Sequence, residues 1–77
     1  MIHRDAFINK IRSLNYTYKD QLKRTHLYRK IGGTHCIYVP MRDLLDDEYV
    51  RNTLRQTGQS ESDIEQFVSQ YASSKPG

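Results

Sequence analysis

The residues best suited to chemistry gather in one stretch of the chain, from Arg24 to Pro40. This stretch reads RTHLYRKIGGTHCIYVP and holds two of the three histidines and the only cysteine. Imidazole titrates near neutral pH, so a histidine among cations can exchange a proton with a phosphodiester that those cations hold. We therefore take His26 as the candidate catalytic residue, acting as general base or general acid. The candidate phosphate-binding cations around it are Lys23, Arg24, Arg29 and Lys30.

Aromatic residues in the same stretch suit nucleic-acid binding. Tyr28 and Tyr38 could stack on unpaired bases of RNA. The other histidines are weaker candidates, because His35 falls near the apolar face of the expected hairpin and His3 lies close to the N-terminus. One cysteine and three scattered histidines form no recognisable zinc pattern, so the sequence predicts no metal and no cofactor.

A β-hairpin must position these side chains. Gly32 and Gly33 separate two runs rich in Tyr, Thr, Val and Ile, and paired glycines supply the positive φ that a tight turn needs. Pro40 cannot donate to a ladder of hydrogen bonds, so the second strand should end there. We expect the two strands at 24–30 and 34–39.

Two registers are open to this hairpin. A two-residue turn would place Ile37 and Val39 on one face with both histidines. A three-residue turn would pair His26 with Tyr38 and place Leu27 on the same face as Ile37 and Val39. We predict the three-residue turn, because a one-residue slip exchanges the faces and the register with one apolar face is favoured. The open face would then carry His26, Tyr28, Lys30, Thr34, Cys36 and Tyr38.

Helical periodicity brackets the strands on both sides. Helices are expected over 5–14, 46–57 and 60–71. Alternation predicts a first strand over 16–20, and a capping box at Ser60 should open the last helix. The expected fold is α+β, with a three-stranded antiparallel sheet, helices on one face and a short extra C-terminal helix. Residues 1–77 should form a single domain, with 72–77 as a flexible tail.

The charge of the chain is divided between its two halves. Residues 1–35 hold eight Lys and Arg against two acids, a net +6, whereas residues 36–77 hold four against seven, a net −3. A basic front predicts a polyanion or an acidic protein as the partner. No apolar run approaches the roughly 20 residues of a membrane span. We therefore expect a soluble, cytoplasmic protein that binds no membrane.

The last two helices could in principle form a helix-turn-helix for DNA. The second helix would have to enter the major groove. Residues 60–71 contain no Lys or Arg, and their three acids, Glu61, Asp63 and Glu65, would repel phosphates. We therefore predict a helical hairpin that closes the core, with Arg51 and Arg55 as an exposed pair, and no DNA binding through these helices.

Several short motifs extend along most of residues 6–68. Arg24-Thr25-His26 opens the expected second strand, and the third strand ends in Val39-Pro40. A helix end of the form Leu-x-x-x-Gly follows at 54–58, and an acidic segment precedes Phe67. Together these motifs resemble the HicA-like (YcfA-type) mRNA interferase toxins of bacterial toxin–antitoxin pairs. That family has a Gly-Ser-His motif at the place of 24–26.

The resemblance implies a fold and an activity. The fold would be α-β-β-β-α, like a double-stranded-RNA-binding domain. The activity would be that of an RNA-binding endoribonuclease, a hydrolase that cleaves mRNA without a metal through the histidine of the second strand, here His26. The partners would be mRNA and a cognate, HicB-like antitoxin protein.

Departures from the family pattern leave alternatives open. Arg24 and Thr25 replace the family's Gly and Ser, the hairpin is shorter, and a closer local match, 33–35, lies one strand later. His35 could therefore be the functional histidine in place of His26. The chain could also be a relative without catalysis, a small adaptor that binds a protein or RNA through its exposed sheet face.

Overall fold

The computed structural model describes residues 1–72, which form an α+β fold. The elements are β1 (Ile2–His3), α1 (Arg4–Ser13), β2 (Tyr16–Leu22), β3 (Thr25–Lys30), β4 (Cys36–Pro40), β5 (Leu44–Leu45), α2 (Asp47–Gln56) and α3 (Glu61–Tyr71). Strands β2, β3 and β4 form an antiparallel sheet in that order. The predicted fold class, the three-stranded sheet and the additional C-terminal helix are confirmed.

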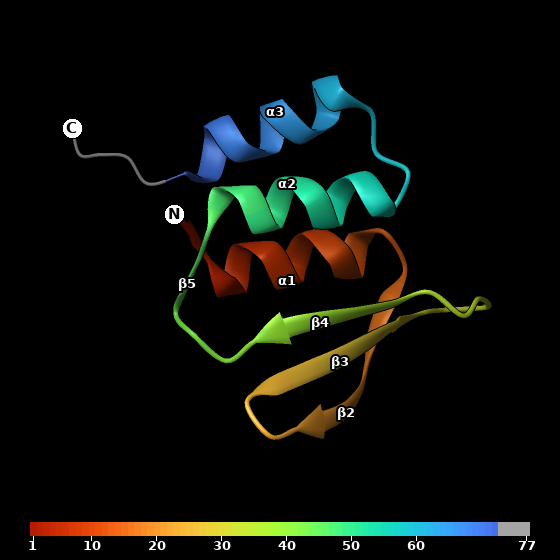
Figure 1. Ribbon diagram of the computed structural model, residues 1–77. Helices are drawn as coiled ribbons and strands as arrows, with labels where there is room; N and C mark the ends of the chain where they lie inside the picture. The colour runs from red at the N-terminus through yellow and green to blue at the C-terminus, as the bar shows by residue number, and fades with distance from the viewer. Residues whose placement is uncertain (73–77) are drawn as a thin grey trace.

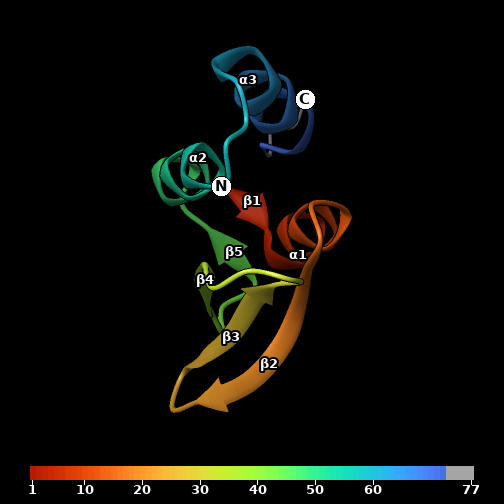
Figure 2. The same cartoon turned by 90° about the vertical axis from the view of Figure 1, so that its right-hand side faces the viewer.

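The elements are arranged in layers. α1 and α2 lie next to the sheet, and α3 lies on the far side of these two helices (Figure 1). The turned view shows the β2–β3 hairpin extending away from the helices (Figure 2). Among residues 1–72, no helix combines the length and the apolar character that crossing a bilayer requires.

Local signals in the sequence account for the ends of the helices. Asn15 follows α1 with a φ of 73°, and Gly58 follows α2 with a φ of 91°. Both are residue types that tolerate the left-handed region where a helix terminates. Ser60 caps α3 as predicted, because the backbone N–H of Asp63 donates to the Ser60 hydroxyl at 3.1 Å, which is the first of the two hydrogen bonds of a capping box.

The register of the hairpin differs from the prediction by one residue. Tyr28 pairs with Ile37 and His26 pairs with Val39, so these side chains share the face that meets the helices. Leu27 is opposite Tyr38 and only half-buried on the other face. The reason is that burying the large ring of Tyr28, which is 7% exposed, removes more apolar surface from water than burying Leu27 would.

The core fills the space between the sheet and the helices. Its largest fully buried side chains are Phe7, Ile2, Ile11, Leu45, Leu54, Ile64, Val39 and Val50. The predicted apolar stripes of the three helices are confirmed in their central positions, whereas Tyr71 at the end of α3 is 42% exposed.

A second pairing, between β1 and β5, has no counterpart among the sequence-based expectations. The strands are antiparallel, with Ile2 opposite Leu45, and both side chains are buried. Ile2 also bridges to Ala72, which therefore belongs to the folded part and not to the expected tail. Strands of two residues are too short to show alternation, so only contact in three dimensions reveals them. The rest of the expected tail, 73–77, lies outside the described residues.

The register can be tested with two matched tyrosine variants. Tyr28→Ala should lower the free energy of unfolding by about 3 kcal/mol, because it empties a buried aromatic position. Tyr38→Ala should cost less than about 1 kcal/mol, since that ring is 55% exposed on the opposite face. Urea denaturation of both variants measures the difference. A larger loss of stability in Tyr38→Ala than in Tyr28→Ala would support the register of the three-residue turn instead.

Candidate nucleic-acid site around His26

His26 lies near the start of β3, half-buried on the face of the sheet that meets the helices. The ring of Tyr18, on the neighbouring strand β2, meets it edge-on with the ring centroids 5.2 Å apart. Arg4, the first residue of α1, places a terminal guanidinium nitrogen 2.6 Å from Nδ1 of His26. The Nε of Arg4 donates to the carbonyl of Pro40 at 3.0 Å. Arg4 thus ties His26 to the start of α1 and the end of β4.

The contact with Arg4 determines which form of the imidazole is present. A guanidinium can only donate hydrogen bonds, so Nδ1 of His26 must be the acceptor. The imidazole is then neutral and carries its proton on Nε2. In this form Nε2 can donate to a phosphate oxygen, but no ring nitrogen is available as a base. Proton transfer at His26 therefore requires Arg4 to leave Nδ1.

A basic hollow lies near this contact at the end of the sheet, although neither His26 nor Arg4 lines it. Its volume is about 540 Å³, and it is lined by Gln21, Lys23, Arg24, Pro40, Met41 and Arg42. Lys23 and Arg24 form the exposed turn between β2 and β3, and Pro40 is the residue whose carbonyl binds Arg4. A hollow of this size can hold a nucleotide, and cations without an acid among them attract phosphate.

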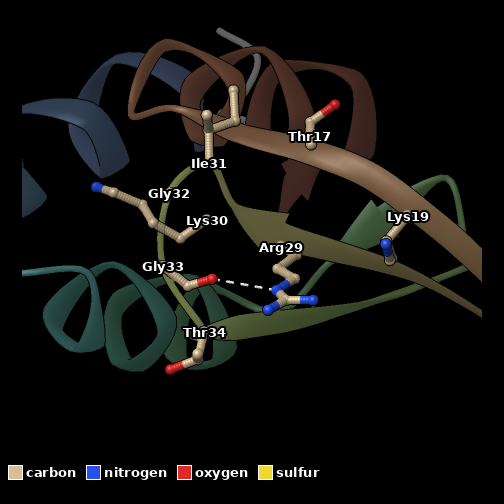
Figure 3. A pocket seen from close by; sticks show the side chains of 8 residues that line it. All are labelled: Thr17, Lys19, Arg29, Lys30, Ile31, Gly32, Gly33 and Thr34. Atoms are coloured by element: carbon tan, nitrogen blue, oxygen red, sulfur yellow. Dashed lines mark hydrogen bonds between the residues drawn. The ribbon is translucent and has the colours of Figure 1, made fainter.

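A second hollow of about 540 Å³ lies around the glycine turn at the opposite end of the hairpin (Figure 3). Arg29 and Lys19 both line it, and Nε of Arg29 donates to the carbonyl of Gly33 at 3.1 Å. The terminal nitrogens of Arg29 remain for a ligand. The ammonium of Lys30 points away from Arg29 and donates to the carbonyl of Leu14 at 3.2 Å. Lys30 therefore anchors the loop after α1.

The predicted site residues are thus divided between the two ends of the hairpin. Lys23 and Arg24 lie at the same end of the hairpin as His26. Arg29 is three residues further along β3, about 10 Å from His26 at the usual rise of a strand. His26 and Arg29 also face opposite sides of the sheet, because three residues is an odd number of steps along a strand.

The two candidate stacking residues, Tyr28 and Tyr38, differ in whether a base can reach their rings. Tyr38 is exposed on the outer face of the sheet and keeps an accessible ring. Tyr28 is buried against the core, and a base cannot stack on a ring that the core covers. Tyr28 is therefore corrected from a binding residue to a core residue, as a direct result of the shifted register.

His35, the alternative functional histidine, is engaged elsewhere. Its Nδ1 lies 2.6 Å from the hydroxyl of Tyr16, and the two rings meet edge-on. Burial raises the pKa of the Tyr16 hydroxyl, with a smaller contribution from Cys36, so this hydroxyl keeps its proton. The contact ties the loop after β3 to the start of β2, which gives His35 a structural role.

The two arginines of α2 form ion pairs with glutamates of α3. Nε of Arg51 lies 2.8 Å from Glu65, and Nε of Arg55 lies 2.6 Å from Glu61. Their hydrogen bonds hold the pKa of both carboxyl groups below the ordinary value. Arg55 is exposed, as expected, and Arg51 is half-buried, but both guanidinium groups are paired and add little to the basic surface at the sheet.

Arg4 is the functional residue that sequence reasoning missed. It is separated from His26 by 22 positions, and a single arginine at the start of a helix has no motif around it. Comparisons with protein-family models, with curated proteins and with solved structures found no match to this chain. Function is therefore inferred from the geometry of the site and from the motifs of the chain itself.

The imidazole form of His26 gives a testable prediction. Long-range nitrogen–proton NMR correlations at pH 8 should show His26 with its proton on Nε2, because Arg4 donates to Nδ1. Arg4→Ala should remove this preference and leave a mixture of the two neutral forms. Arg12→Ala, a change at the other end of α1, is the control and should leave the His26 spectrum unchanged. A proton on Nδ1 in the unchanged protein would contradict the contact.

Proposed function

We propose that this protein binds RNA and cleaves mRNA in the cytoplasm, as the toxin of a toxin–antitoxin pair, with His26 taking part in proton transfer. The observation that carries the proposal is the placement of His26, whose ring is held by Arg4 beside a hollow lined by Lys23, Arg24 and Arg42. A histidine and several cations at one end of a sheet suit a phosphodiester. The motifs that resemble HicA-like toxins point to the same histidine.

RNA is favoured as the substrate because it carries its own nucleophile. In the proposed step the 2′-oxygen forms a bond to phosphorus and the bond from phosphorus to the 5′-oxygen breaks. The products are a 2′,3′-cyclic phosphate and a 5′-hydroxyl. A base takes the proton of the 2′-hydroxyl, and an acid returns one proton to the 5′-oxygen. His26 would supply one of these two transfers.

Arg4 links binding to this chemistry. A phosphate oxygen is a stronger acceptor for a guanidinium than a neutral imidazole nitrogen, because the hydrogen bond is then charge-assisted on both sides. An RNA phosphate at the basic hollow would draw Arg4 away from His26. Nδ1 would then be available to take a proton, and the same arginine would neutralise charge that develops on phosphorus. Arg4 would thus keep His26 inactive until a phosphate arrives.

A protein antitoxin of HicB type is the partner that the proposal requires. A toxin that cleaves mRNA must be held inactive in its own cell, and the basic surface around His26 is the part that an acidic partner would cover. A second candidate function is favoured by the exposed ring of Tyr38 and by Arg29 on the outer face. If the protein has no catalytic activity, it would be a small adaptor that binds RNA or protein through that face.

RNA binding can be tested through its dependence on charge and salt. The double variant Lys23→Glu/Arg24→Glu should weaken binding to a single-stranded RNA at least tenfold. The slope of the logarithm of the binding constant against the logarithm of the salt concentration should become shallower by about 0.7 per lost phosphate contact. Arg12→Glu is the control, because it reverses one charge away from the hollow; it changes the net charge by two units, against four for the double variant. Fluorescence anisotropy at several salt concentrations measures both. Binding that ignores salt, or that Arg12→Glu weakens equally, would contradict the proposed site.

Cleavage can be tested with a substitution that preserves the contact with Arg4. His26→Gln keeps a hydrogen-bond acceptor for Arg4 but cannot exchange protons. It should reduce cleavage of a labelled RNA by roughly 10²–10⁴-fold, the usual contribution of a general acid or base. The midpoint of thermal unfolding should fall by no more than about 4–8 °C, since a half-buried polar site contributes about 1 kcal/mol. Induced expression should arrest growth only for the unchanged protein.

His35→Gln separates the alternatives that the sequence left open. It removes the imidazole ring that packs edge-on against Tyr16, so it should lower stability more than it lowers cleavage. If His35→Gln abolishes cleavage in a folded protein and His26→Gln does not, the functional histidine is His35. If the unchanged protein binds RNA but never cleaves it, the adaptor function replaces the enzyme.

A further inference from the structure

One face of the β2–β3 hairpin changes from buried to open along its length. Tyr28 and Tyr18 are opposite each other on the side of the helices, but Tyr28 is buried whereas Tyr18 is 49% exposed. Further along the strands, Gln21 is opposite His26, and Gln21 is exposed. The hairpin extends beyond the helices in the turned view, which explains this change (Figure 2). Tyr18, Gln21 and His26 together form what we call the hairpin shelf.

The ring of Tyr18 is held in place on this shelf by two other rings. It meets the ring of His26 edge-on, with the centroids 5.2 Å apart, and the ring of Tyr28 edge-on, with the centroids 5.8 Å apart. Edge-on pairs are a favoured geometry of aromatic rings. Because Tyr28 belongs to the core, Tyr18 is fixed to a rigid part of the fold. A ligand that stacks on the exposed part of this ring therefore loses little free energy in ordering it.

An irregularity in β2 keeps the acid of this strand off the shelf. The register shifts between Tyr18 and Asp20, so Asp20 is opposite Leu27 and faces the outer side of the sheet. In a regular strand Asp20 would share the face of Tyr18, because side chains two positions apart point the same way. The shift brings Gln21 to the shelf instead, opposite His26. A carboxylate that would repel phosphate is thus replaced on this face by a neutral amide.

The shelf leads into the basic hollow. Gln21 lines that hollow together with Lys23 and Arg24. A phosphate held by these cations carries a sugar and a base, and the shelf is the adjoining surface on which the base can lie. The faces of an unpaired base are stabilised by stacking on an aromatic side chain. The bases of a duplex are already covered on both faces by their neighbours, so the shelf suits a single strand.

The other exposed tyrosines of residues 1–72 lie away from His26. Tyr38 is on the outer face of the sheet. Tyr71 packs against another ring of α3, on the far side of the other two helices (Figure 1). Tyr18 is the exposed ring that contacts His26, and it therefore has the position that a base-stacking residue of this site requires.

We propose that Tyr18 is the residue on which an unpaired base of single-stranded RNA stacks when the phosphate of that nucleotide lies in the basic hollow. This role of Tyr18 rests on the proposed binding of RNA at the hollow but not on cleavage. Stacking accepts any base, since every base has an aromatic face. The protein should therefore favour single-stranded over double-stranded RNA and show little preference for sequence.

The test compares two strands of equal charge, a hexamer of uridylate and an abasic hexamer that has the same phosphates without bases. Tyr18→Leu keeps an apolar side chain against Tyr28 and His26 but removes the flat ring. It should weaken binding of the uridylate hexamer roughly 5- to 150-fold, the range for the loss of one stacked base. Binding of the abasic hexamer should stay the same, because the phosphate contacts are unchanged. Fluorescence anisotropy at one fixed salt concentration measures each affinity.

Two further variants separate stacking from other effects. Tyr18→Phe keeps the ring and loses only the hydroxyl, so it should bind both hexamers as the unchanged protein does. Tyr38→Leu makes the matched substitution at an exposed ring on the outer face, and it should leave the binding of both hexamers unchanged. Thermal unfolding followed by circular dichroism checks that each variant is folded.

An NMR measurement on the unchanged protein needs no variant. Addition of the uridylate hexamer should move the aromatic proton signals of Tyr18 upfield, because a stacked base places these protons within its ring current. The signals of Tyr38 should stay in place. The abasic hexamer should move neither set of signals.

The proposal is overturned if Tyr18→Leu leaves binding of the uridylate hexamer unchanged, or weakens binding of both hexamers equally. It is also overturned if the uridylate hexamer moves the signals of Tyr38 and not those of Tyr18, since RNA would then lie on the outer face of the sheet. A protein that binds neither hexamer overturns both RNA binding and this role of Tyr18. If Tyr18→Leu selectively loses the uridylate hexamer but the unchanged protein never cleaves RNA, this proposal stands and the enzymatic one fails.

Discussion

The burial of Tyr28 against the helices is the interaction on which the rest of the structure depends. Because Tyr28 faces the core together with Ile37 and Val39, the register of β3 and β4 is fixed. Side chains alternate along a strand, so this one choice also decides the direction of its neighbours. His26 must face the helices, and Arg29 must face away from them.

The same choice brings His26 to Arg4. An arginine at the start of α1 could reach neither the outer face of the sheet nor a histidine on it. With His26 turned inward, one guanidinium bridges the imidazole and the carbonyl of Pro40. Two consequences follow, a neutral imidazole with a defined proton position and an end of β4 that is tied to α1. The candidate site and the anchoring of the sheet therefore share a single side chain.

The distribution of charge has a structural basis as well. The acids of α3 are paired with the arginines of α2, and both kinds of residue are neutralised at the contact between these helices. Within residues 1–72, no ion pair joins the cations of β2, of the β2–β3 turn or of the hollow beside Pro40 to an acid. The sheet side therefore keeps cations that the contact between the two helices does not neutralise.

The sequence by itself determined the three helices, the three strands of the main sheet and their order. Periods of 3.6 and 2, the capping box at Ser60 and the left-handed residues at Asn15 and Gly58 are local signals, and local signals set the ends of helices and strands. It also pointed to His26 with Lys23 and Arg24, because these residues are neighbours in the chain. Local patterns could not choose between two hairpin registers one residue apart, each of which gives a plausible apolar face.

Only the tertiary structure decided what depends on contacts between distant segments. The helices select the larger ring, Tyr28, over Leu27, and this excludes Tyr28 from binding a base. Two contacts join residues far apart in sequence: the pairing of β1 with β5, and the contact between Arg4 and His26. No periodic pattern in the sequence predicts either of them. Burial in a close-packed core is a property of the whole fold, so the register and the partner of His26 follow from the complete structure.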